Sequence, residues 1–234
     1  MKRLNKLIYF ALACTFFVTS CELTETEEEK NNIDVTDYSD NKETEIKSEW
    51  SEEEIAKANT AANISSMSQM DKDIILFCNL ARLNGRKFWE TYASPNAYGS
   101  QSYINSLKID LENATGLAML VPEASLQKAA EYHANDMSKN NFFEHTSYDG
   151  TSFSERVRSF YKGSAIAENI SAGKTDALGV VIQLLIDDGI TTLGHRKNIL
   201  NANYTAIGVK SASHVQWRNV TVQDFGNKVI DKLE

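Results

Sequence analysis

Cysteine and proline are both scarce in this chain. Its 234 residues include three cysteines, at positions 14, 21 and 78, and two prolines. The first two cysteines lie in or beside an N-terminal apolar segment, so Cys78 stands alone in the rest of the chain. A lone cysteine excludes an intramolecular disulfide there. Because Cys78 falls in a segment predicted to be helical, we interpret it as a small core residue rather than a nucleophile.

The chain also lacks a basic stripe. Its net charge is −8, and residues 22–57 alone hold 14 acids against four lysines, whereas residues 58–234 hold 17 basic and 18 acidic side chains. A nearly neutral domain without clustered lysine or arginine excludes nucleic acid as a partner. The acidic stretch has almost no aromatic content and no hydrophobic periodicity, so it cannot offset its ordering entropy by burial. We predict a disordered acidic tether over residues 21–65, with a frayed helix near residues 50–62.

The first 21 residues predict export. Three basic residues precede an apolar run over positions 7–18, which is long enough for a secretory signal and short for a membrane span. The run ends in Val18-Thr19-Ser20-Cys21, which resembles a bacterial lipobox. The resemblance implies a signal peptide over residues 1–20 and lipidation of Cys21, for example with palmitate. We therefore expect a lipid-anchored protein of the bacterial cell envelope, periplasmic or on the cell surface. The alternative is an ordinary secreted protein with an incidental cysteine.

Residues 66–234 are long enough for one domain with one good core. Apolar spacing predicts helices over residues 70–91, 103–111, 122–140, 151–161 and 176–187, with Asp71 as the cap of the first. Two segments rich in branched residues, 205–211 and 215–225, read as strands. Helices first and hairpin strands last indicate an α+β domain with an antiparallel sheet.

Histidine is rare too, and its distribution is informative. Of four histidines, His145 and His195 lie in short polar segments with acids nearby, and the pair Glu168-Asn169 lies between them in the sequence. Imidazole with carboxylate can hold a divalent metal or move a proton. These residues are therefore predicted to share a cleft. His133 falls on the apolar face of the helix predicted over residues 122–140, where a satisfied core histidine is the favoured interpretation.

Seven strings in order resemble the CAP superfamily (cysteine-rich secretory proteins, antigen 5, pathogenesis-related 1), in its bacterial SCP-like branch. They are NLARLNG, LQKAAEYHANDM, EHTSYDG, AENISAG, GHRKNIL, YTAIGV and VQDFG, spread over residues 70–226. The resemblance implies a three-layer α-β-α sandwich with a central antiparallel sheet. It also implies a cleft tetrad of two histidines and two acids: His145, Glu168, His195 and, aligned to the fourth position, Asp188. The family usually has glutamate there, so the shorter aspartate makes direct metal contact less favourable.

Two interpretations of the tetrad stay open. The two imidazoles and two carboxylates can bind zinc or another divalent ion, or they can form a buried hydrogen-bonded cluster without metal. Three functions follow from these interpretations. The first is a membrane-tethered binding module whose cleft holds a divalent metal and a small or lipidic ligand. The second is a metal-dependent or His/Glu-assisted hydrolase that uses His145, Glu168 and His195. The third is a surface interaction protein with a purely structural cleft. We favour the binding module.

Overall fold

The computed structural model describes residues 49–234. The predicted signal peptide, Cys21 and the tether up to residue 48 lie outside the described residues. The elements are α2 (Glu52–Ala58), α3 (Gln69–Leu83), α4 (Gly85–Phe88), the π-helix η2 (Trp89–Ala93), α5 (Ser94–Asn96), α6 (Gln101–Asn113), β1 (Val121–Pro122), α7 (Ala124–Asn140), α8 (Phe153–Phe160), β2 (Ile166–Ala172), α9 (Ala177–Ile186), α10 (Gly194–Ile199), β3 (Ala206–His214) and β4 (Arg218–Gly226). Over residues 49–234, no helix has the length and apolar character needed to cross a membrane.

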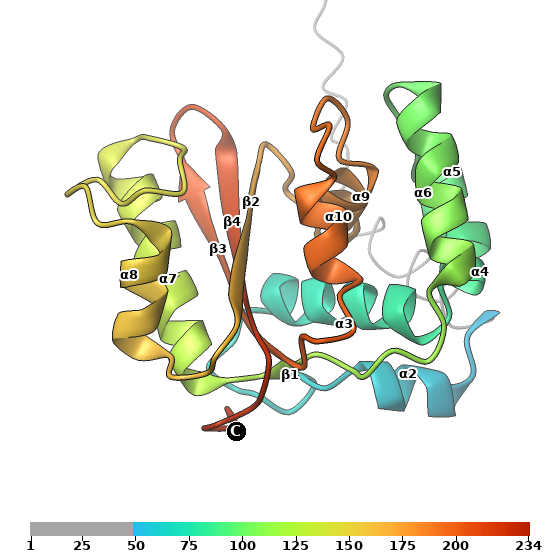
Figure 1. Ribbon diagram of the computed structural model, residues 1–234, viewed down its shortest axis with the longest axis horizontal. Coiled ribbons are helices and arrows are strands. Elements are labelled where there is room, and N and C mark those ends of the chain that lie inside the picture. Colours follow the sequence, from blue (N-terminus) through green and yellow to red (C-terminus); the bar gives the residue numbers. More distant parts are fainter. Residues whose placement is uncertain (1–48) are drawn as a thin grey trace, which may run out of the picture. The chain divides into compact units, whose positions relative to one another are not determined.

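The sheet that the described residues form has four strands in the order β1-β3-β4-β2 (Figure 1). Strands β2, β4 and β3 pair antiparallel, which agrees with the antiparallel sheet expected, while the two-residue β1 pairs parallel with β3 at the other edge. The hairpin predicted at the end of the chain is confirmed as β3 and β4. Strand β2 was not predicted, because Glu168 and Asn169 interrupt its apolar pattern.

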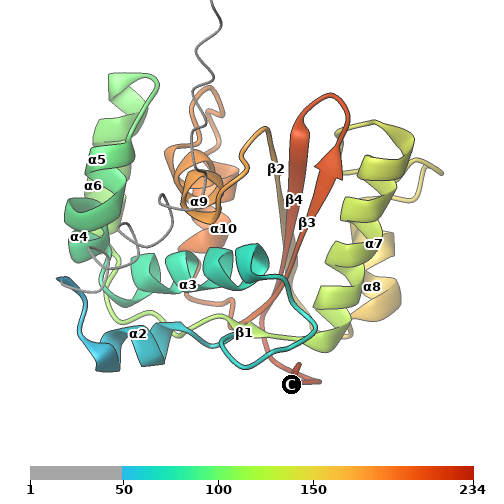
Figure 2. The ribbon, with the colours of Figure 1, turned by 180° about the vertical axis from the view of Figure 1, so that it is seen from behind.

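Helices cover both faces of this sheet. Helices α7 and α8 lie on one side, and α3, α9 and α10 lie on the other (Figures 1 and 2). The larger apolar cluster packs α3 and α9 against the sheet, and two smaller clusters pack α7 and α8 against the opposite face. The predicted three-layer α-β-α sandwich is therefore confirmed.

Helix α7 lies unusually close to the sheet at Gly208. A Cβ atom added to Gly208 would overlap the carbonyl group of Leu126 and the backbone nitrogen of Gln127. Backbone atoms cannot swing aside as a flexible side chain can, so only glycine fits here. Glu123 caps the helix by accepting from the backbone N–H of Leu126, so α7 begins at Ala124 rather than at Pro122, which lies in β1.

The first predicted helix is broken. Helix α3 ends at Leu83, because Asn84 leaves the helical conformation and its side chain caps α4. At the start of α3 the cap is Ser68 rather than Asp71. Asp71 is buried instead, and it accepts a 2.8 Å hydrogen bond from the backbone N–H of Ser211 on β3.

The expectation of disorder up to residue 65 is wrong for residues 50–65. Trp50 is only 2% exposed and stacks on Tyr92, and its indole N–H donates to Thr91. Helix α2 follows, capped by Ser51, and Ala58, Ala61 and Ile64 join the main core. The negative charge of residues 22–57 hid this change in the sequence, because Glu52 and Glu53 are exposed while Ile55 and Ala58 pack on the core. The domain therefore includes residues 50–65 as well as residues 66–234.

Candidate functional site

The first histidine–carboxylate pair joins a loop to edge strand β2. His145 lies in the loop between α7 and α8, and its Nδ1 is 2.8 Å from Oε1 of Glu168 on β2. The Glu168 side chain is almost fully buried, whereas that of His145 is 49% exposed. Because an ionised carboxylate only accepts hydrogen bonds, Nδ1 carries the proton and Nε2 of the neutral ring keeps a free lone pair.

Arg156 on α8 completes this pair. Its Nη2 donates to Oε2 of Glu168 at 2.5 Å, and its Nη1 donates to the backbone carbonyl of His145 and to Oγ of Ser147. Burial alone raises the pKa of Glu168, but the hydrogen bond from His145 and the charge of Arg156 outweigh it and hold that pKa below its usual range. Arg156 thus keeps Glu168 ionised and fixes the histidine loop to it.

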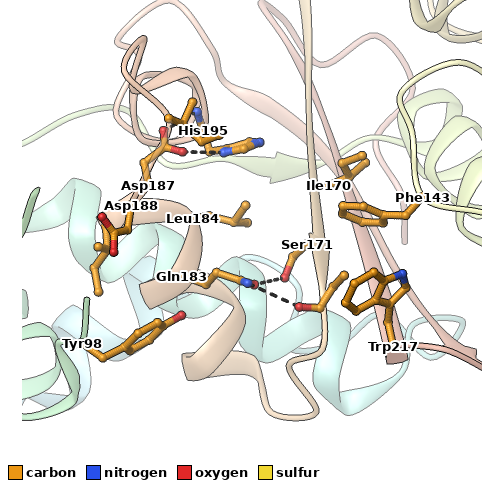
Figure 3. Close-up of a pocket in the computed structure, with 13 residues that line it drawn as sticks. Tyr98, Phe143, Ile170, Ser171, Gln183, Leu184, Asp187, Asp188, His195 and Trp217 are labelled. Carbon is orange, nitrogen blue, oxygen red and sulfur yellow. Dashed lines mark hydrogen bonds and ion pairs between the residues drawn. The ribbon is translucent and has the colours of Figure 1, made fainter. Parts of the chain in front are cut away.

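The second pair lies at the junction of α9 and α10. Asp187 ends α9 in the left-handed conformation, and its fully buried carboxylate meets Nδ1 of His195 at 2.7 Å (Figure 3). Its other oxygen accepts from the backbone N–H groups of His195 and Arg196. One aspartate therefore caps the start of α10 and orients the ring, again leaving Nε2 without a partner among the described residues.

The structure differs here from the alignment that assigned Asp188 to the tetrad. Asp187 holds the histidine, while the Asp188 carboxylate accepts a 3.0 Å hydrogen bond from the backbone N–H of Ser100. The fourth tetrad position was assigned to the wrong one of these two aspartates because the helix was predicted to continue through position 187. In a continuous helix, the side chains of residues 187 and 188 point to different faces. The left-handed backbone at Asp187 ends the helix one residue earlier than that prediction assumes.

The two pairs lie on opposite faces of β2 and are linked through its backbone. Glu168 is in register with Asp224 on β4 and with Gly208 on β3, the position that contacts α7, so Glu168 points to the α7 side. Asn169 points the other way, and its amide donates to the carbonyl of His195 and to the Gln223 side chain. Asn198 on α10 donates to the carbonyl of Glu168 and to Oδ1 of Asn169. The strand edge therefore positions both histidines.

Unpaired buried groups lie behind Glu168. Asp224 is 0% exposed, and neither of its oxygens has a hydrogen-bond partner in the described residues. Burial and the neighbouring charge of Glu168 raise the pKa of Asp224 well above its usual range. His133 is also buried: Nε2 meets the carbonyl of Glu144 at 2.8 Å, Nδ1 has no partner within residues 49–234, and burial lowers its pKa. His133 is therefore a core residue, as predicted, but it is not the satisfied histidine expected, because its Nδ1 has no partner among the described residues.

A groove of about 380 Å³ opens beside His195 (Figure 3). Asp187, Asp188, Gln183 and Ser171 contribute its polar side chains, and Tyr98, Phe143 and Trp217 contribute its aromatic rings, with aliphatic residues of β2 and α9 between them. Asp188 and Tyr98 lie on one side of the groove, and Phe143 and Trp217 lie on the other. This volume suits a small ligand.

The donor set fits a metal ion only in part. The two free Nε2 atoms are suitable ligands, and carboxylates on Nδ1 are the partners that orient metal-binding imidazoles. Both oxygens of Glu168 and of Asp187 are already engaged, however. Across residues 49–234, no group of three histidine, cysteine or acidic side chains is arranged to hold an ion. Neither acid is therefore free to act as a ligand, and the candidate ligands are the two Nε2 atoms, which have no partner among the described residues.

The chain belongs to the cysteine-rich secretory protein family (CAP), whose model matches residues 78–225. It is 32% identical over 146 residues to the uncharacterised protein YkwD of Bacillus subtilis, covering 59% of this chain and 53% of that protein. It is 32% identical over 106 residues to the uncharacterised membrane protein YlbC of the same organism, covering 43% of this chain and 29% of that one. The chain thus spans about half or less of these relatives.

Solved structures of bacterial proteins are also similar. One is an extracellular protein containing an SCP domain from Bacillus anthracis, with a TM-score of 0.40 and 25% identity, covering 60% of this chain and 43% of that one. Another is an outer surface protein of Borrelia burgdorferi, with a TM-score of 0.41 and 18% identity, covering 54% of this chain and 90% of that one.

Three functional residues escaped the sequence analysis. The sequence pattern gave Arg156 and Asp224 no role in the cleft, and it placed the fourth tetrad position at Asp188 rather than at Asp187. The position of Arg156 on the first turn of a helix capped by Ser152 and Glu155 was readable from the sequence. Its direction toward Glu168 was not, because β2 had not been predicted.

Proposed function

We propose that this protein is an exported CAP-domain binding module, tethered to the membrane through lipid on Cys21, whose cleft holds a ligand at His145 and His195. One observation carries the proposal: each imidazole is fixed at Nδ1 by a buried carboxylate, which leaves Nε2 free and preoriented. The groove beside His195 supplies apolar surface for the rest of a small or lipidic ligand.

A divalent ion such as zinc is the first ligand we propose. Nε2 of His145 and Nε2 of His195 would hold it, and Glu168 and Asp187 would fix the two rings from behind. A bound ion would supply positive charge and open coordination positions for a ligand group. Two protein ligands make a weak site, so we expect binding that a chelator reverses readily.

The arrangement supports binding more than nucleophilic hydrolysis. Ser171 donates to Oε1 of Gln183 at 2.5 Å, and Ser147 accepts from Arg156, so neither hydroxyl is paired with a histidine of the described chain. Cys78 is fully buried, and burial raises the pKa of its thiol to about 12, which keeps it inert. A hydrolase would need water activated at the histidines. The hydrolase alternative requires peptide or ester cleavage that disappears in His145→Ala and His195→Ala variants.

Calorimetric titration of the full chain with zinc tests the site. We expect saturable one-to-one binding, its loss in the His145→Ala/His195→Ala variant, and its retention in Asp188→Asn, which removes an acid that orients neither ring. Zinc binding that survives the double variant would place the ion elsewhere. No binding by the wild type would leave the tetrad as a structural hydrogen-bonded network and remove metal from the proposal.

Location is tested separately. Metabolic labelling with a palmitate analogue in a bacterial host should mark the wild-type protein and leave Cys21→Ser unlabelled, with the variant moving from the membrane fraction to the medium or periplasm. Equal membrane association of both proteins would show that Cys21 is not the anchor. Cys78→Ser is unsuitable as a control because that residue is buried, so a variant at Cys14 serves instead.

A further inference from the structure

The lining of the groove beside His195 holds two carboxylates and no lysine or arginine of the described residues. Its ionisable side chains are Tyr98, Asp187, Asp188 and His195, and the ammonium of Lys174 lies at the rim over the Tyr98 ring. Both oxygens of Asp187 are engaged in hydrogen bonds, whereas Asp188 is exposed and forms no ion pair with any basic side chain of residues 49–234. A groove of this kind repels anions and attracts cations.

The carboxylate of Asp188 is held in place. Its Oδ2 accepts the backbone N–H of Ser100 and occupies the space that a Cβ atom on Gly99 would need. Gly99 has a φ of +98°, so glycine both permits the turn and leaves room for the acid. The remaining oxygen, Oδ1, has no partner in the part of the chain that the structure describes. The chain has therefore fixed an unpaired negative charge at the rim of an apolar groove.

The ring of Tyr98 lies on the same side of the groove as that charge, and the rings of Phe143 and Trp217 lie across the groove from it (Figure 3). Tyr98 is 41% exposed and Trp217 is 40% exposed, and Trp217 is packed against Phe143 with ring centroids 6.3 Å apart. The ring of Tyr98 already carries the ammonium of Lys174, 4.2 Å from its centroid. Exposed aromatic faces next to a carboxylate are the features that recognise alkylated ammonium groups. Lys174 shows that an ammonium is accommodated at this rim.

We infer that the groove binds a small organic ammonium compound, with its cationic group at Asp188 and its apolar body between Tyr98 and the Phe143–Trp217 pair. This inference rests on the proposed function as a binding module, and it names the class of ligand that the groove takes. Metal at the two histidines is a separate property, because Asp188 orients neither imidazole and both histidines use other acids. The two can therefore fail independently.

Choline and its neutral isostere, 3,3-dimethylbutan-1-ol, provide the test with the full chain. Binding is followed by calorimetry and by the indole N–H signal of Trp217 in NMR spectra. We expect choline to bind roughly ten times or more tightly than the isostere, which has the same shape without the charge. In Asp188→Asn we expect the ratio of choline affinity to isostere affinity to fall to about one, with binding of the isostere unchanged. Glu112→Gln makes the same change of charge on α6 and should leave this affinity ratio unchanged.

Two further variants separate this inference from the metal site. Trp217→Leu should weaken choline and the isostere alike, because it removes apolar surface that both use. The His145→Ala/His195→Ala variant should lose zinc and keep the preference for choline. Equal affinities for choline and the isostere, a preference that persists in Asp188→Asn, or no choline binding up to about 100 mM would each overturn the inference. Absence of zinc binding alongside an Asp188-dependent preference for choline would uphold it and remove only the metal.

Discussion

Replacing Arg156 by methionine should destabilise the domain strongly. The side chain of Arg156 is 1% exposed and makes the ion pair with Glu168, whose own side chain is equally buried. Methionine fills much of the same space but leaves Glu168 charged and buried without its cation. Removal of one partner from a buried ion pair costs about 3–5 kcal/mol. A domain of ordinary stability has about 5–15 kcal/mol in total, so the loss is a large fraction of it.

The pH dependence of that loss identifies its cause. In the wild type the pKa of Glu168 is lowered, so its contribution is present above the ordinary glutamate pKa of about 4.3 and is lost as pH falls through the folded-state value. In Arg156→Met, burial outweighs what remains and the pKa rises. The loss of unfolding free energy relative to the wild type should therefore be largest at neutral pH. It should shrink on acidification, as Glu168 accepts a proton.

Urea unfolding at pH 7 and pH 4.5 measures this effect, with Arg158→Met as the control. Arg158 is exposed on the same helix and donates only to the carbonyls of Gly163 and Ser164. The double variant Arg156→Met/Glu168→Gln should recover part of the loss, since it removes the stranded charge. A deficit below about 1 kcal/mol, or one that is equal at both pH values, would refute the assignment of Arg156 as the counter-ion of Glu168.

Three shorter predictions concern the surrounding structure. Burial and a neighbouring carboxylate raise the pKa of Asp224. The free energy of unfolding of the wild type should therefore fall as pH rises from about 3.9 through that raised value. Urea unfolding from pH 4 to 8 should show that Asp224→Asn gains stability relative to the wild type over this range. Gly208→Ala should lower the free energy of unfolding by about 1–3 kcal/mol or more, because the added methyl group would overlap the Leu126 backbone. Gly194→Ala should not, because the nearest atom to its added Cβ is 3.6 Å away. Equal melting temperatures of the two variants would contradict this prediction. A chain that starts at residue 66 should be less stable than one that starts at residue 49, because it lacks the buried Trp50. The expected difference is at least the roughly 3–5 kcal/mol that is typical of losing a buried tryptophan. Similar denaturant midpoints of the two chains would show that α2 is dispensable.

The α-layers and the hairpin were predictable because their signals are local. Helix α9, for example, has an apolar stripe with Asp176 as its cap, and β3 and β4 are rich in branched residues. Strand β2 was missed because its central residues are the functional ones. Glu168 is tolerated in a buried strand through its contacts with His145 and Arg156, which no local pattern encodes.

Most residues of the candidate site could be predicted from the sequence, but their arrangement could be predicted only in part. The sequence pattern brings His145 near Glu168, and the structure places them 2.8 Å apart. The choice between Asp187 and Asp188 depends on where α9 ends, and helix ends depend on the left-handed conformation of a single residue. The groove could not be predicted, because its aromatic rings come from segments more than 40 residues apart in the chain.

Strand β2 is at an edge of the sheet, and such an edge is a template on which another chain can add a strand. Three side chains donate hydrogen bonds to backbone carbonyls of β2. Asn198 donates to Glu168, Gln183 donates to Ala172, and the hydroxyl of Tyr204 donates to Ile166. Residues of α9, of α10 and of the segment after α10 thus also shield the strand from self-association. Variants that loosen α10 should consequently aggregate, and a ligand that orders this segment should keep the protein monodisperse.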